Sequence, residues 1–215
     1  MVKATKDNRP FSSGVFDLEE FNIYTKVIDL PLDGIPTYLE EGINGVCTGG
    51  SALFNVFSNK RRVVKNDLIT IFPYQLASIT EISTDFAVIF FKVPKKLFMD
   101  TINGLGRLTL DYFFYMRKYY SSPLSEEEYK RFVHFCHILS CRVDLSCAFL
   151  RRESVMYLLR VYYWDYKSNP KAMASVKFVR KEKQVFEFFY LVIEYHTISR
   201  DVAFYAIRCL SHLNI

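Results

Sequence analysis

His134, His137 and Cys141 are the residues whose types and spacing best suit metal chemistry. Zinc prefers imidazole nitrogens and thiolate sulfurs, and helical side chains three or four residues apart share one face. A three-ligand metal site is therefore conceivable, but we favour a cluster at the boundary of a helix. The spacing of Cys136, Cys141 and Cys147 matches no zinc motif.

Other enzyme chemistry finds little support in the sequence. No histidine precedes His134, so the N-terminal half lacks the usual imidazole ligand or general base. We find no Ser-His-Asp arrangement with supporting context, no P-loop and no dinucleotide fingerprint. We therefore predict no catalytic residues, no metal and no cofactor, and a protein that is not an enzyme.

The composition indicates a folded protein of one or two domains. Of its 215 residues, 50% are hydrophobic and 17% aromatic, which excludes a disordered chain. Apolar runs such as Phe86 to Phe91 are far too short to cross a bilayer, and the polar N-terminus predicts no secretory signal. Five cysteines without framework spacing suit a reducing cytosol. We expect a cytoplasmic protein whose net charge of +5 permits a nucleic-acid partner without requiring one.

Ile35 to Lys92 is predicted to form about seven short strands, because turn residues recur without a helical period between them. Such a segment folds as an antiparallel sandwich or barrel. Asn59 to Lys65 is expected to be a basic hairpin that keeps a sheet edge soluble. Phe86 to Phe91 is expected to be a strand covered on both faces.

After Pro94 the pattern becomes helical. Ser125 and Glu128 predict a capping box, with three glutamates in the first helical turn. Ser199 is expected to cap a short final helix. The other predicted helices run from Lys95 to Asn103, from Thr109 to Lys118, from Glu126 to about Val143, from about Leu150 to Tyr166 and from about Val176 to Tyr195.

Several of these motifs, in this order, resemble AraC-type transcription regulators. "PLSEEEY" resembles the entry to the linker helices of that family, and Arg151-Arg152-Glu153 precedes a long apolar helix as it does there. Ser199 to Ala206, "SRDVAFYA", resembles the first helix of the DNA-binding domain. The sensor half of the family carries a turn-strand-proline phrase, which here consists of Asn66, Asp67, Leu68, Phe72, Pro73, Gln75, Ala77 and Ser78.

The resemblance implies an α+β protein, with an N-terminal antiparallel β-barrel of the cupin-like, double-stranded β-helix type followed by a helical region. Residues 1–106 would be the sensor domain, residues 107–198 the linker and dimerisation region, and residues 199–215 the remnant of a helix-turn-helix domain. The function implied is ligand sensing and dimerisation in a bacterial transcription regulator. Two alternatives stay open: a metal-dependent cupin enzyme, such as a dioxygenase or isomerase, and a free-standing small-molecule-binding cupin module. Ala77 occupies a position that often carries histidine, which argues against the enzyme.

The expected partners are a second copy of the chain and a small-molecule effector. The mouths of barrels are common binding sites. The candidate ligand-binding residues are Phe54, Val56, Ile69, Ile71, Tyr74 and Phe86. The apolar stripe of the helix from Glu126 to Val143 is wider than one packing partner needs. The candidate dimer contacts on it are Phe132, Phe135, Ile138 and Leu139.

The sequence follows the family phrase through Ala206 and departs from it at Ile207. We expect DNA binding only through a C-terminal domain that this chain lacks, because a recognition helix must reach base edges. A one-base deletion after the Ala206 codon is one hypothesis. Restoring an A there permits the reading Asn-Lys-Val-Ser-Leu-Thr-Leu-Lys-Tyr, which resembles the family. The codons of the gene decide between this hypothesis, a natural short form and an arbitrary boundary.

Overall fold

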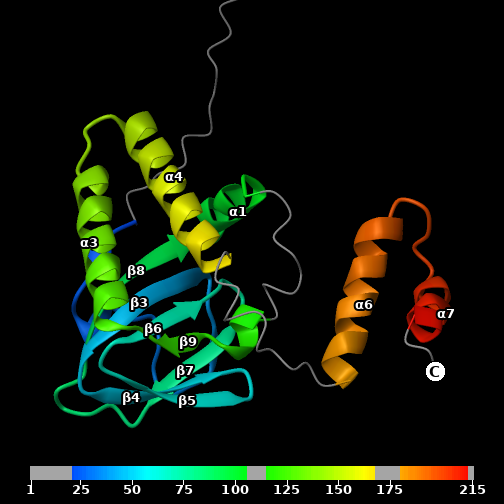
Figure 1. The fold of residues 1–215 in the computed structure, drawn as a ribbon, viewed down its shortest axis with the longest axis horizontal. Coiled ribbons are helices and arrows are strands. Elements are labelled where there is room, and N and C mark those ends of the chain that lie inside the picture. Colours follow the sequence, from blue (N-terminus) through cyan, green and yellow to red (C-terminus); the bar gives the residue numbers. More distant parts are fainter. Residues whose placement is uncertain (1–20, 106–114, 168–179, 213–215) are drawn as a thin grey trace, which may run out of the picture.

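The computed structural model describes residues 21–105, 115–167 and 180–212. Two antiparallel sheets form its β half (Figure 1). The five-stranded sheet has the order β1 (Ile23–Tyr24), β8 (Ala87–Pro94), β3 (Glu41–Gly49), β6 (Asp67–Ile71) and β9 (Ser121–Pro123). The four-stranded sheet has the order β2 (Thr37–Tyr38), β7 (Leu76–Thr80), β4 (Ser51–Val56) and β5 (Asn59–Val64). A short 3-10 helix, η2 (Val27–Asp29), follows β1 along the chain.

The described residues do not form the closed barrel that the sequence predicts. Among them, no strand of one sheet pairs with a strand of the other, so the β half is a pair of packed sheets. The α+β class is confirmed, as are the seven strands, β2 to β8, predicted between Ile35 and Lys92. β9 was not predicted: it lies between the helices expected from Thr109 to Lys118 and from Glu126 to Val143, and it extends the five-stranded sheet by pairing with β6.

Two apolar cores lie on opposite faces of the five-stranded sheet. The inter-sheet core contains Phe54, Ile71 and Phe90, whereas the helix-side core contains Phe91 and Phe132. Because successive side chains of a strand point to opposite faces, Phe90 and Phe91 enter different cores. The prediction of a strand covered on both faces is therefore confirmed.

The turns and edges follow from a few residues. Asn66 has φ 71°, a left-handed conformation that asparagine tolerates, and the Asp67 carboxylate accepts the Val64 N–H at 3.0 Å. The side chain of Gln75 accepts the Phe72 N–H at 2.9 Å and closes the turn after Pro73. β5 is an edge strand whose exposed residues include Lys60, as expected for a charged hairpin that blocks pairing with other chains.

Helices α1 (Lys95–Asn103), α3 (Glu126–Val143) and α4 (Ala148–Lys167) cover the outer face of the five-stranded sheet (Figure 1). The predicted bounds of α1 and α3 are confirmed, and α4 extends about two residues beyond its expected start. Residues 115–118 are helical, whereas residues 109–114 of that predicted helix lie outside the described residues. No helix among the described residues is long and apolar enough to cross a membrane.

Helices α6 (Arg180–Tyr195) and α7 (Val202–His212) pack on each other, and the Tyr195 and Phe204 rings lie 5.7 Å apart. The first residues of the predicted third helix, 176–179, lie outside the described residues. The cap of α7 differs from the prediction. The Asp201 carboxylate accepts the Ala203 N–H at 3.0 Å, while Ser199 accepts the Asp201 N–H at 3.2 Å, so the serine supports the cap rather than forming it.

The capping box of α3 is confirmed. The Ser125 hydroxyl accepts the Glu128 N–H at 3.3 Å, and the Glu128 carboxylate accepts the Ser125 N–H at 2.8 Å. Hydrogen bonds from the Ser125 backbone and then its side chain hold the pKa of Glu128 below its ordinary value. A carboxyl group with a lowered pKa contributes stability at neutral pH and loses that contribution as the pH falls through its folded-state pKa.

Replacing Ser125 by alanine should lower the free energy of unfolding by about 1 kcal/mol, because the Glu128 N–H loses its side-chain acceptor at the start of the helix. Urea denaturation followed by circular dichroism measures this at neutral pH. Ser140→Ala in the same helix is the control and should be neutral or slightly stabilising. The difference between wild type and Glu128→Gln should shrink in acid, and a difference that grows there would contradict the assigned pKa direction.

Candidate functional site

Five of the six predicted ligand-binding residues meet inside the inter-sheet core. Phe54, Val56, Ile69 and Ile71 are at most 1% exposed, and Phe86 is buried beside them. The Phe54 and Phe86 rings lie 6.3 Å apart in an edge-on arrangement. The structure thus brings these side chains together as packing partners of one another. Whether they also contact a ligand stays a prediction.

Tyr74, the sixth of these residues, lies elsewhere. It occupies a turn with φ 64° and is 53% exposed, so its side chain leaves the core at the end of β6. It borders an open groove of about 840 Å³. The groove is lined by Pro31, Thr37, Tyr38, Leu39, Glu40, Glu41, Tyr74, Pro94, Lys95 and Lys96.

The groove combines aromatic walls with charged groups. The Lys95 ammonium lies 4.8 Å from the centre of the Tyr74 ring, a cation–π distance. On another wall, the Glu41 carboxylate lies 3.4 Å from Lys92. Burial, the largest single effect, lowers the pKa of Lys92, but the charges of Glu41 and Tyr24 and their hydrogen bonds together outweigh burial and leave this pKa above its ordinary value. Such a surface can hold a small molecule that offers both an apolar ring and a polar group.

The candidate metal ligands do not converge. His134, His137 and Cys141 are exposed on α3, and no three His, Cys, Asp or Glu side chains within residues 21–105, 115–167 and 180–212 are grouped to hold a metal. Ala77 is buried in the inter-sheet core. Burial raises the pKa of the Cys136 thiol to about 12, which suits a packed side chain rather than a nucleophile.

Two of the four predicted dimer contacts are buried within their own chain. Phe132 and Leu139 belong to the helix-side core, and the half-buried Phe135 ring stacks on Tyr162 at 5.4 Å. Ile138 is also half-buried. The wide apolar stripe of α3 is therefore largely occupied by the five-stranded sheet and by α4.

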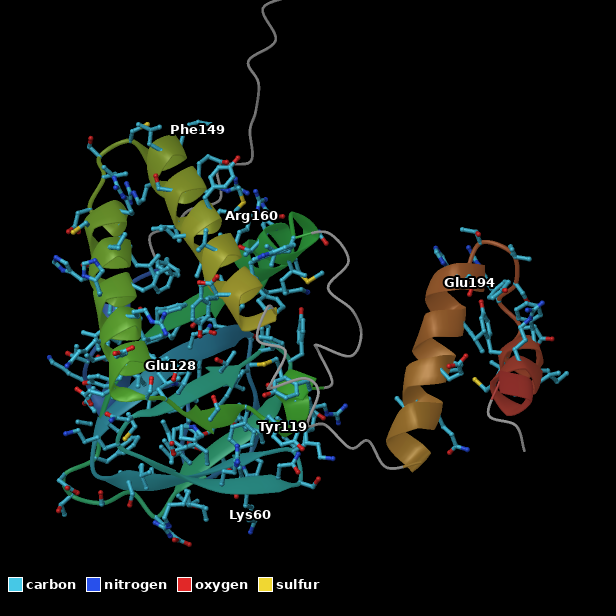
Figure 2. The ribbon with its side chains drawn as sticks, in the orientation of Figure 1. Lys60, Tyr119, Glu128, Phe149, Arg160 and Glu194 are labelled. Atoms are coloured by element: carbon cyan, nitrogen blue, oxygen red, sulfur yellow. The ribbon has the colours of Figure 1, made fainter. Side chains whose placement is uncertain are left out.

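A different apolar face lies on α4. The side chains of Leu150, Tyr157, Val161 and Trp164 are 55%, 58%, 57% and 48% exposed. Residues seven apart on a helix fall within about 20° of each other, so these residues form one stripe, which we call the outer stripe of α4. Its inner counterparts Val155, Leu159 and Tyr163 are buried in the helix-side core. Figure 2 labels two residues of α4: Phe149, which is exposed, and Arg160, which is half-buried and donates to the Asp100 carbonyl on α1. The sequence signal was the seven-residue spacing within a helix that is apolar on most sides.

Sequence reasoning also missed a buried polar cluster. Asn44 and Thr70 are direct partners across the β3–β6 ladder. The Asn44 amide donates to the Tyr163 hydroxyl at 3.1 Å, and the Thr70 and Tyr162 hydroxyls lie 3.3 Å apart. Burial raises the pKa of Tyr163 well above its usual range, against a smaller lowering by Asn44, so its hydroxyl stays protonated. The available signal was a polar residue inside each of two apolar strands.

Comparisons with known proteins give only distant structural likenesses. No family model and no curated protein sequence matches the chain. The chain is similar to a variant of ToxT from Vibrio cholerae in its apo form, at 8% identity and a TM-score of 0.43, covering 91% of this chain and 67% of that one. It is similar to the AraC-like transcriptional activator CuxR at 9% identity and a TM-score of 0.35, covering 81% of this chain and 58% of that one.

A third solved structure is the CO-dependent transcription factor CooA from Carboxydothermus hydrogenoformans. Here the identity is 10% and the TM-score 0.22, covering 97% of this chain and 83% of that one. CuxR and CooA are regulators of transcription, but likenesses this distant support no argument about the function of this chain.

Proposed function

We propose that this chain is the ligand-sensing and dimerisation region of an AraC-type transcription regulator. The sequence motifs support it, because the turn phrase lies on β6 and β7, "PLSEEEY" starts α3 and Ser199 to Ala206 leads into α7. The observation that carries the proposal is the outer stripe of α4. A row of exposed apolar side chains on the face of a helix turned away from its own core indicates a protein partner.

The partner that fits the stripe is a second, antiparallel copy of the chain. Leu150 and Trp164 each lie seven residues from Tyr157, so a two-fold axis at Tyr157 puts Leu150 of one copy opposite Trp164 of the other. In that arrangement the apolar residues of the stripe face those of the other copy. Glu153 and Arg160 are already engaged within their own chain, with Arg152 and with the Asp100 carbonyl, so the contacts of the stripe are apolar rather than charged. The order of apolar residues along the stripe therefore allows it to pair with a second copy of itself.

The effector is proposed to be a small molecule that binds at the groove beside Tyr74. This assignment keeps Tyr74, one of the six sequence-based candidates, at the open surface and treats the other five as packing residues of the inter-sheet core. Crystals of the chain purified directly from its host would test it. Density for a small molecule in the groove or between the sheets supports sensing, and chains that never retain or bind a small molecule in a metabolite screen contradict it.

Metal analysis and sizing separate the alternatives. A metal-dependent cupin enzyme would retain a transition metal after purification. A free-standing binding module would take up a ligand as a monomer. The proposed function requires dimers, which sedimentation equilibrium of the full chain detects as a concentration-dependent rise in mass. A strictly monomeric mass at high micromolar concentration would refute it.

We expect this chain to bind DNA only weakly and without sequence preference. The residues proposed to make such contacts are Lys60, Arg61, Arg62 and the basic cluster from Lys177 to Lys183. Arg62 already pairs with Glu81, which offsets its charge, and Arg61 donates to the Ser121 carbonyl, which occupies part of its guanidinium. Mobility-shift titrations should show binding that collapses as salt rises, because released counterions drive it. Salt-resistant binding to one sequence would contradict this prediction.

A further inference from the structure

The four side chains Asn44, Thr70, Tyr162 and Tyr163 form the polar cluster between the five-stranded sheet and α4. All four are buried, at 0%, 2%, 8% and 1% exposure. They pair in register: two neighbouring residues of α4 contact two cross-strand partners, Tyr163 with Asn44 on β3 and Tyr162 with Thr70 on β6. Each strand of the central pair is therefore connected to α4 by one hydrogen-bonded contact.

The surroundings of the cluster are aromatic. The Tyr162 ring lies 5.8 Å from Phe91 and 6.1 Å from Phe132, and the Tyr163 ring lies 5.8 Å from Phe98. Polar groups in such a layer are desolvated, and their hydrogen bonds recover only part of that cost. Among the described residues, the Asn44 Oδ1 atom has no hydrogen-bond partner. The cluster is thus a poor source of stability compared with a fully apolar layer.

What a polar pair adds to an apolar layer is a single preferred alignment. Aromatic rings can pack acceptably in several rotations of a helix, whereas directional hydrogen bonds at about 3 Å are made in one. Single buried polar residues fix the register of helix pairs in this way. Here the two hydroxyls lie in the C-terminal half of α4, between Val161 and Trp164 of the outer stripe.

We infer that the polar cluster fixes the rotation of α4 on the β3–β6 pair and couples that pair to the outer stripe. Because Tyr162 and Tyr163 point inward where Val161 and Trp164 point outward, a rotation that breaks the inner contacts turns the outer residues by the same angle. A sliding of β3 along β6 would move Asn44 away from Thr70. Tyr163 and Tyr162 could then no longer keep both of their hydrogen-bonded contacts at the same time. The part of this inference that concerns the dimer rests on the proposed function, whereas the alignment of α4 does not.

The test removes the two hydroxyls without changing the apolar volume. In the full chain, Tyr162→Phe with Tyr163→Phe should raise hydrogen exchange of the α4 amides by about tenfold or more, because α4 gains alternative alignments that open more readily. Exchange in α3 should change little. The control is Tyr120→Phe, which removes another buried hydroxyl. That hydroxyl donates to the Phe54 and Asn59 carbonyls at 2.8 and 3.1 Å, in the inter-sheet core.

A second variant set tests the pairing itself. The effects of Thr70→Val and Tyr162→Phe on the hydrogen-exchange rates of the α4 amides should not add, because each substitution removes the same contact. The effects of Thr70→Val and Tyr163→Phe, which remove different contacts, should be closer to additive. The inference is overturned if the tyrosine double variant raises hydrogen exchange in α4 no more than Tyr120→Phe does. It is also overturned if Thr70→Val and Tyr162→Phe have additive effects.

The dimer provides a separate readout. If wild-type chains dimerise, the double variant should weaken the dimer more than Tyr120→Phe does. If wild-type chains are monomeric while α4 exchange responds as expected, the proposed function fails and the alignment role stands. If the dimer is present and neither exchange nor affinity responds, the alignment role fails and the proposed function stands.

Discussion

Aspartate in place of Val161 is expected to abolish dimer formation without unfolding the chain. Val161 is 57% exposed on α4, so the folded monomer keeps the new carboxylate in water. In the proposed dimer the same carboxylate would lose water without gaining a counterion. We expect the dimer dissociation constant to rise by at least about 100-fold, equivalent to about 2.8 kcal/mol.

Sedimentation equilibrium over a range of concentrations measures this change. Val202→Asp on α7 is the matched control, since Val202 is 75% exposed and lies outside the outer stripe. It should leave the dimer intact. Equal weakening by both variants would mean that added charge, rather than the α4 face, is responsible, and an unchanged dimer in Val161→Asp would place the interface elsewhere.

Removing the Phe91 ring is expected to be the most damaging single change to folding. Phe91 is fully buried, and its ring lies 5.9 Å from Phe21, 6.2 Å from Phe132 and 5.8 Å from Tyr162. It thereby joins β8, the second strand of the five-stranded sheet, to both α3 and α4. Phe91→Ala should lower the free energy of unfolding by about 3–5 kcal/mol, because it leaves a cavity that rigid rings cannot fill.

Urea denaturation in the Val161→Asp background measures this loss without a contribution from the dimer. Phe149→Ala is the control, because Phe149 is 69% exposed at the start of α4. It should change the unfolding free energy by no more than about 0.5 kcal/mol. A loss for Phe91→Ala as small as that of the control would contradict the assignment of a single helix-side core.

The sequence predicted those parts of the fold that depend on neighbouring residues. Ser125 and Glu128 specify the start of α3 through contacts three residues apart, and Asn66 specifies a turn through its own backbone. Features that depend on distant residues were beyond such reasoning. Whether the β half closes depends on which strands pair, and the partnership of Asn44 with Thr70 depends on the register between β3 and β6.

Apolar periodicity also shows that a face is buried without showing what buries it. The broadly apolar helix makes Phe132 and Leu139 candidate contacts for a second copy, yet their own sheet and α4 cover them. The outer stripe of α4 uses the same residue types and is exposed. Likewise, Phe54 and Ile71 have the properties of both a packed core and a cavity wall, and only the observed packing places them in the core.

Chemical cross-linking at the outer stripe tests the central claim most directly. Cys141, Cys147 and Cys209 are not buried and would first be replaced by serine, leaving the buried Cys47 and Cys136. A short thiol-specific cross-linker would then join single cysteines introduced at positions 150, 157 and 164. Tyr157→Cys should cross-link with itself, and Leu150→Cys should cross-link efficiently only when mixed with Trp164→Cys. Chains that remain unlinked at all three positions would contradict dimerisation through α4, and equal self-linking at all three would contradict its antiparallel form.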